Sequence, residues 1–240
     1  MFINTFRAGT SKYRLLTATE FIAKDEGEIF VKDFSIAMAL VDYVPVLFFS
    51  AAALFLQGDL YNKMCKGTYA LFAAGTINVA CAGLLKATYK LLYAAGICDF
   101  TPLNDIFFPV QSIGFLLAGA GILLMYMRKV SGGSCCCAVA APVVWKGTFL
   151  FVGLMVAGLG CINFGLAVMA AKLKKRSAIV LFVISFVCSL CMGYLSSQDF
   201  TGAFMNWLAQ GINVIGQGSF LAAAVVLHKA GLKELVWERK

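Results

Sequence analysis

The stretch "TFLFVGLMVAGLGCINFGLAVMAA", from Thr148 to Ala171, decides the fold class. It is 24 residues long and contains no charged side chain. An α-helix rises about 1.5 Å per residue, so roughly 20 apolar residues cross a hydrocarbon core about 30 Å thick. We therefore predict a membrane-spanning helix here.

The rest of the chain repeats this pattern. Of its 240 residues, 61% are hydrophobic and only 13% are charged; a typical soluble domain carries about 25% charged residues. Continuous apolar runs, rather than the short alternating segments of a β-barrel, indicate helical spans. We predict an all-α polytopic integral membrane protein, for example of the cell inner membrane, with further spans at residues 35–57, 67–96, 106–127, 178–195 and 202–227.

The number of spans depends on the uncharged segment "VSGGSCCCAVAAPVVW", Val130 to Trp145. Cytoplasmic loops are rich in Lys and Arg. All the basic loops share one side only if the chain crosses once more within this segment. We therefore predict seven spans, with the N-terminus outside and the C-terminus in the cytoplasm; the alternative is six. The basic loops contain Lys63 and Lys66, Arg128 and Lys129, and Lys172 to Arg176, and a basic tail follows.

Seven spans divide the chain into three parts. Residues 1–34 are extramembrane and have the pattern of an amphipathic surface helix, residues 35–229 form the transmembrane bundle, and residues 230–240 form a basic cytoplasmic tail. The first 34 residues lack the apolar core of a signal peptide.

The bundle has the pattern of a 3+1+3 parallel repeat. Asp-Phe-Thr occurs at 99–101 and again at 199–201, each time before a third span. In that span a Gln precedes Phe-Leu, as Gln111 in one half and Gln217 in the other. Coincidence is the alternative. Some transporters use parallel repeats and bind substrate between the halves. The plan is similar to that of seven-helix sugar-transporter and sorting-receptor folds, but none of their motifs is present.

Four carboxamides interrupt the last span within "NWLAQGINVIGQG", at spacings of four, three and four residues. At 100° per residue they form a stripe about 60° wide on one helix face. Lipid cannot satisfy their hydrogen bonds, so the stripe faces protein or water. Amides also join membrane helices, at roughly 0.6–2 kcal/mol per contact. We expect a polar cavity lined by Asn206, Gln210, Asn213 and Gln217.

Other polar residues are expected at a similar depth, in the outer half of the membrane: Asp42, Lys86, Lys90 and Gln111. Buried ionisable groups pair or line water. Asp42 can pair with Lys86 or Lys90 but cannot neutralise both, and the surplus positive charge favours an anionic ligand. The alternative is that Lys90 reaches the interface while Lys86 alone pairs with Asp42.

These residues predict a small transporter or ligand-binding membrane protein for a polar or anionic small molecule. The alternatives are a structural or assembly subunit with partner membrane subunits, or an intramembrane lipid-modifying enzyme with Asp42 and a lysine as acid and base. We expect no catalytic residue, metal, cofactor or nucleic-acid partner. The only histidine, His228, is expected to cap its helix or to extend to the membrane interface, and the nine cysteines do not indicate a disulfide scaffold.

Overall fold

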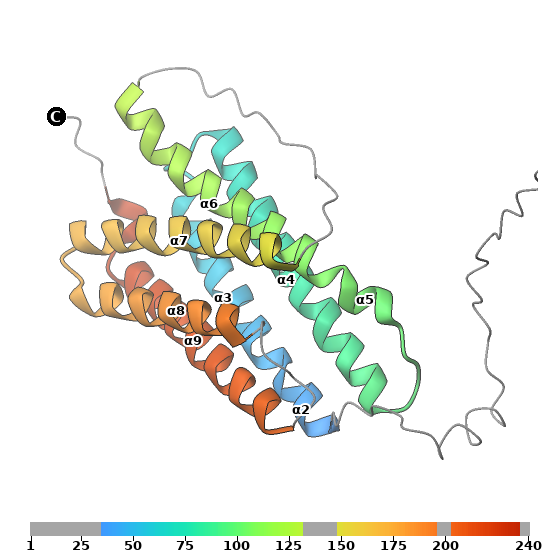
Figure 1. The fold of residues 1–240 in the computed structure, drawn as a ribbon. Coiled ribbons are helices and arrows are strands. Elements are labelled where there is room, and N and C mark those ends of the chain that lie inside the picture. The colour runs from blue at the N-terminus through green and yellow to red at the C-terminus, as the bar shows by residue number, and fades with distance from the viewer. Residues whose placement is uncertain (1–34, 132–147, 196–202, 236–240) are drawn as a thin grey trace, which may run out of the picture. The chain divides into compact units, whose positions relative to one another are not determined.

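The computed structural model describes residues 35–131, 148–195 and 203–235, and all the regular structure in these ranges is helical. Six of its helical segments are long and apolar enough to cross a membrane (Figure 1). The helices are α2 (Ile36–Val41), α3 (Tyr43–Leu60), α4 (Lys66–Ala94), α5 (Thr101–Asp105), α6 (Phe107–Ser131), α7 (Thr148–Lys172), α8 (Arg176–Leu195) and α9 (Ala203–Lys229), followed by the 3-10 helix η1 (Leu232–Glu234). Together α2 and α3 form one candidate span.

The six long spans predicted from the sequence are confirmed as helices, with ends that differ by a few residues. The predicted short span at 130–145 is not tested, because α6 continues to Ser131 and residues 132–147 lie outside the described residues. The predicted amphipathic segment at 1–34 and the second Asp-Phe-Thr triplet lie outside them as well.

Two helical segments are each interrupted by a single residue. Asp42 separates α2 from α3, and Ile106 separates α5 from α6. Pro45 and Pro109 are each the third residue of the helix that follows. A proline ring clashes with the carbonyl four residues earlier, which here belongs to the last residue of α2 or α5. The break places Asp42 at a helix junction.

Four pairs of neighbouring helices run antiparallel: α3–α4, α4–α6, α7–α8 and α8–α9. In the first pair, Val46 faces Gly83, and Gln57 further along α3 donates a hydrogen bond to Thr76 earlier on α4. Lipid provides no hydrophobic force between helices, so such contacts depend on close packing of small residues.

Helices α6 and α7 instead run in the same direction. The backbone of Phe115 lies 2.5 Å from the position that a Cβ on Gly158 would occupy, and Ile122 packs against Gly165 further along both helices. Ser131 at the end of α6 and Thr148 at the start of α7 therefore lie at opposite ends of the bundle (Figure 1).

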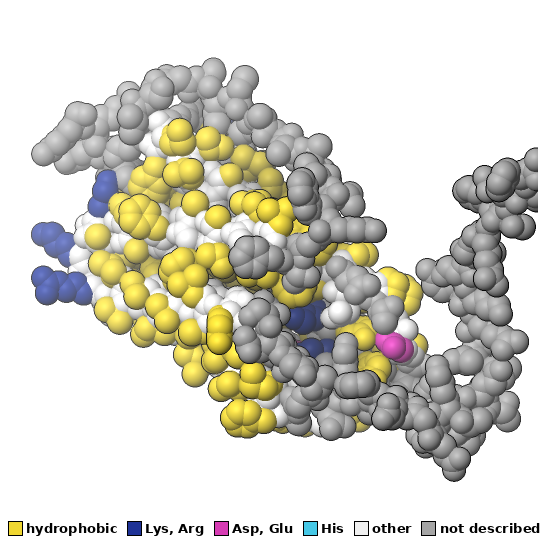
Figure 2. All heavy atoms as spheres, in the orientation of Figure 1, with side chains coloured by type: hydrophobic (Ala, Val, Ile, Leu, Met, Phe, Trp, Pro, Cys, Tyr) yellow, Lys and Arg dark blue, Asp and Glu magenta, His cyan; other side chains and the backbone are white. Residues whose placement is uncertain are grey.

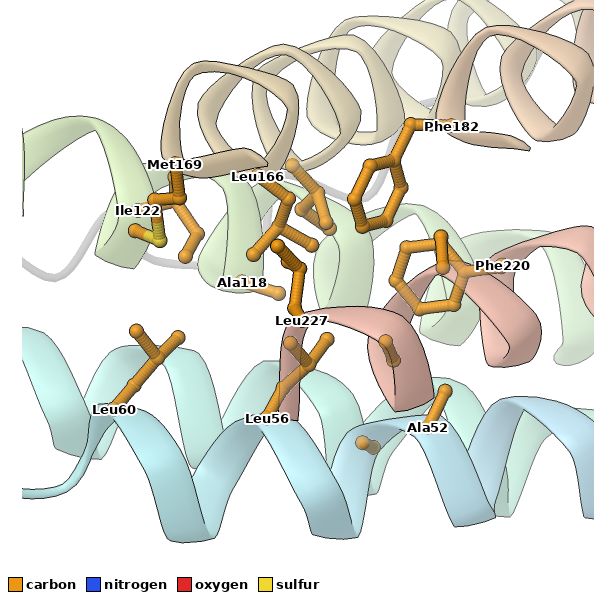
Figure 3. Close-up of a cluster of buried hydrophobic side chains, with 14 of the residues drawn as sticks. Ala52, Leu56, Leu60, Ala118, Ile122, Leu166, Met169, Phe182, Phe220 and Leu227 are labelled. Carbon is orange, nitrogen blue, oxygen red and sulfur yellow. The ribbon is translucent and has the colours of Figure 1, made fainter. Parts of the chain in front are cut away.

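Helices α3 and α9 form the second parallel pair and complete a ring of six helices. Phe49 of α3 stacks on Phe220 of α9, with ring centroids 6.0 Å apart, and Asp59 contacts His228 at the end of both helices. All six long helices contribute to the hydrophobic core, in which Leu56, Leu166 and Leu227 point toward one another (Figure 3).

The ring has two chemically different ends, which are named after the acidic residues at either end of α3. At the Asp42 end, α3, α6, α7 and α9 begin; at the Asp59 end they finish. Exposed basic side chains protrude where α7 meets α8, at the Asp59 end (Figure 2). Large apolar side chains cover the flanks, including Phe164, which is 73% exposed. Such a surface is typical of a protein embedded in lipid.

We predict that Gly158→Ala destabilises the protein by about 1–3 kcal/mol, because the new methyl group meets the α6 backbone. Gly153→Ala on the same helix is the matched control, since nothing lies within 4 Å of its Cβ position. The measurement is the free energy of unfolding in detergent micelles. Equal stability of the two variants would contradict the parallel α6–α7 contact.

Candidate functional site

The four carboxamides of the last span all lie on α9. Asn206 and Gln210 are buried, whereas Asn213 and Gln217 are half-buried. The helix packs between α3 and α8. The stripe therefore starts in a buried region at the Asp42 end and becomes more accessible along α9.

Gln210 links α9 to the first span. Its side-chain nitrogen donates a 2.9 Å hydrogen bond to the Met38 carbonyl on α2, which also accepts the Asp42 amide at 3.3 Å. The Gln210 side-chain oxygen is buried and accepts no hydrogen bond from any described residue. An unsatisfied buried carbonyl costs roughly 1–3 kcal/mol. The nitrogen of this amide thus joins two helices, and its oxygen has no partner among the described residues.

Asp42 forms an ion pair with Lys90 of α4, at 2.5 Å between carboxylate oxygen and ammonium nitrogen. Both side chains are largely buried, at 14% and 13% exposed. Nearby, the Tyr43 hydroxyl and the Thr88 hydroxyl share a 3.0 Å hydrogen bond between the same helices. Of the two partners predicted for Asp42, the structure selects Lys90, so the alternative of Lys86 as the sole partner is wrong.

Lys86 lies one helical turn before Lys90 and has a different environment. Its ammonium nitrogen is 3.9 Å from the centre of the Phe107 ring and 5.6 Å from that of Phe108. No described carboxylate pairs with it. A cation over an aromatic face is stabilised but keeps its net charge. Among the described side chains, the structure thus pairs one of the two lysines with a carboxylate and places the other over an aromatic ring.

Three further candidates, Gln111, Asn213 and Gln217, form no hydrogen bond or ion pair with this cluster in the described residues. Gln111 is half-buried on α6, which packs mainly against α4 and α7 rather than against the amide-bearing face of α9. Asn213 and Gln217 form no hydrogen bond with described residues. The structure thus connects Gln210, Asp42 and Lys90, with Lys86 adjacent.

The residues of this cluster differ in the chemistry that they offer. Lys86 offers a partly desolvated positive charge, the Gln210 oxygen can accept a hydrogen bond, and the Asp42–Lys90 pair holds α3 and α4 together beside them. The sequence analysis did not identify Phe107 and Phe108 as part of this cluster. Their position just before Pro109, at the start of a predicted span, was the only available signal.

His228 lies in the last turn of α9, as its position in the sequence indicates, and it has a partner that the sequence did not reveal. Its Nδ1 atom lies 3.0 and 3.1 Å from the two carboxylate oxygens of Asp59, a residue that sequence reasoning had placed beyond the first span. Asp59 lies in the last turn of α3 and His228 in the last turn of α9. Only the packing of these two parallel helices shows that the two residues are neighbours.

Within the described ranges, six cysteines are free and no three His, Cys, Asp or Glu side chains are grouped to hold a metal ion. Comparisons with protein-family models, curated proteins and solved structures found no match.

We predict that Asp42→Asn lowers the free energy of unfolding by about 3–5 kcal/mol, because it leaves two partly buried lysines without a described carboxylate partner. The double variant Asp42→Asn/Lys90→Met should recover part of this loss. The free energy of unfolding of both variants is measured in detergent micelles. Asp99→Asn, at an exposed carboxylate at the same end, should have little effect, because an asparagine oxygen can still accept the hydrogen bond from the Tyr89 hydroxyl. Strictly additive losses in the double variant would show that the ion pair contributes nothing.

Proposed function

We propose that the protein is a small membrane transporter or ligand-binding membrane protein that holds a polar or anionic molecule at the Asp42 end of its bundle. In this proposal Lys86 provides the positive charge for the ligand and Gln210 accepts a hydrogen bond from it. The observation that carries the proposal is the presence, on three packed helices, of two partly buried lysines, one described carboxylate and an amide oxygen without a described partner. Groups this costly to bury mark functional sites in membrane proteins.

The proposal includes seven crossings. Because α6 and α7 are parallel, a chain in which both cross the membrane must return between Ser131 and Thr148. The 16 residues from Val130 to Trp145 would extend about 24 Å as a helix, short of a typical 30 Å core. Local thinning of the bilayer and the flanking lysines Lys129 and Lys146 would compensate.

Loop charge supports the orientation. The Asp59 end contains the basic residues of the loops, so it would face the cytoplasm and the candidate site would face outward. The C-terminus is then cytoplasmic and the N-terminus external. The described basic residues at that end are Lys63, Lys66, Lys172, Lys174, Lys175, Arg176, Lys229 and Lys233.

The order and direction of the helices support an internal repeat. The series α3, α4, α6 and the series α7, α8, α9 have the same alternation of directions, and the two parallel contacts, α6–α7 and α9–α3, join one series to the other. The phenylalanines that follow Gln111 and Gln217 both contact Phe49 of α3, with ring centroids 5.9 Å away for Phe115 and 6.0 Å away for Phe220.

A structural or assembly subunit is the second candidate. The half-buried Asn213 and Gln217, which lack hydrogen bonds to described residues, favour it because a partner helix could satisfy them. Stoichiometric copurification of another membrane protein, lost in Asn213→Leu/Gln217→Leu, would support this function over ligand binding.

The test of ligand binding is a melting-temperature screen of the purified protein with small carboxylates, phosphate esters and uncharged polyols. We expect at least one anion to stabilise the wild type, and we expect Lys86→Leu and Gln210→Leu to abolish that shift while the protein remains monodisperse. Lys66→Leu is the matched control, since it removes an exposed lysine from the far end of the same helix. An absence of stabilisation by every compound, or an unchanged response of both variants, would overturn the proposal.

A further inference from the structure

A second pair of ionisable residues lies at the opposite end of α3. Asp59 is only 2% exposed, and its sole described hydrogen-bonding partner is the imidazole of His228. The His228 side chain is 47% exposed, and its ring packs on Phe55 with centroids 5.1 Å apart. One member of the pair is thus buried and the other reaches the surface.

The pair joins two helices that meet nowhere else through ionisable groups in the described residues. Helices α3 and α9 run parallel, and Asp59 and His228 occupy their last turns. Directly after His228, the chain turns through Gly231, whose φ of 80° suits glycine, and η1 buries Leu232 completely. Loosening this pair would therefore affect both the α3–α9 contact and the start of the tail.

The surrounding charges come from every neighbouring element. Lys63 in the α3–α4 turn donates a 2.6 Å hydrogen bond to the Leu235 carbonyl. Burial lowers the pKa of Lys63, and the negative charges of Glu234 and Asp59 oppose this change. The other described charged side chains at this end are exposed: Lys66 on α4, Lys172 on α7, Lys174 and Lys175 in the α7–α8 turn, Arg176 on α8, Lys229 on α9, and Lys233 and Glu234 on η1.

The net charge of the pair depends on one proton. With a proton on both ring nitrogens, the imidazolium neutralises the Asp59 carboxylate. When that proton leaves, a buried negative charge remains, and its burial is unfavourable unless water reaches it. Histidine is the side chain that ordinarily changes charge between about pH 5 and 8.

We propose that Asp59 and His228 together bind a proton and form a latch between α3 and α9 at the Asp59 end. The protonated latch is closed; loss of the proton hydrates Asp59 and loosens the end of α9 together with η1. The inference does not rest on the proposed function, because it requires no ligand at the Asp42 end.

Hydrogen–deuterium exchange of the purified full chain in detergent tests this proposal, with rates corrected for the chemical effect of pH. In the wild type, we expect exchange in peptides covering the end of α9 and η1 to rise at least ~3-fold from pH 6 to pH 8. Asp59→Asn and His228→Gln should remove this dependence on pH. Lys229→Gln, an exposed neighbour on the same helix, should retain it.

A second measurement uses the fact that the chain contains one histidine. In protein labelled with ¹⁵N-histidine, the ring signals should show a hydrogen-bonded Nδ1–H in the wild type that is lost in Asp59→Asn. Exchange independent of pH in the wild type, or the same pH dependence in His228→Gln, would overturn the proposal. His228 is half-exposed, so its substitution decides the question even if Asp59→Asn does not fold.

Discussion

The close parallel contact between α6 and α7 is the constraint on which the architecture depends. It requires glycine at Gly158 and Gly165, because the backbone of Phe115 and the side chain of Ile122 occupy the space of a Cβ. Because α6 and α7 follow one another in the chain and run in the same direction, the end of α6 and the start of α7 lie at opposite ends of the bundle. The described basic residues of the turns then share the Asp59 end, while the Asp42–Lys90 pair and Lys86 lie at the other.

The α3–α9 interface connects the two polar regions. At the Asp42 end, Gln210 of α9 donates to the Met38 carbonyl just before α3; at the other end, His228 of α9 meets Asp59 of α3. Between them the contact is apolar, through Phe49 and Phe220. A relative movement of these helices would therefore alter both regions.

The sequence was sufficient for the helices and for part of the site. Apolar runs define the spans because only a helix satisfies its own backbone in lipid. The spacing of the α9 amides and the match of Asp42 with a lysine on α4 also follow from helical geometry. The sequence could not show that Lys86 lies over Phe107, or that Asp59 meets His228, because both contacts depend on the packing and register of helices distant in the chain.

The central claim is that α6 and α7 run in the same direction. It is tested most directly by measuring on which side of the membrane each helix end lies. Fusions of alkaline phosphatase or green fluorescent protein after Asn62, Asp99, Ser131, Gly147 and Lys174 report that side in bacterial cells. The account predicts cytoplasmic fluorescence at Asn62, Ser131 and Lys174, and external phosphatase activity at Asp99 and Gly147. If the fusions after Ser131 and Gly147 report the same side, the arrangement of seven crossings is contradicted.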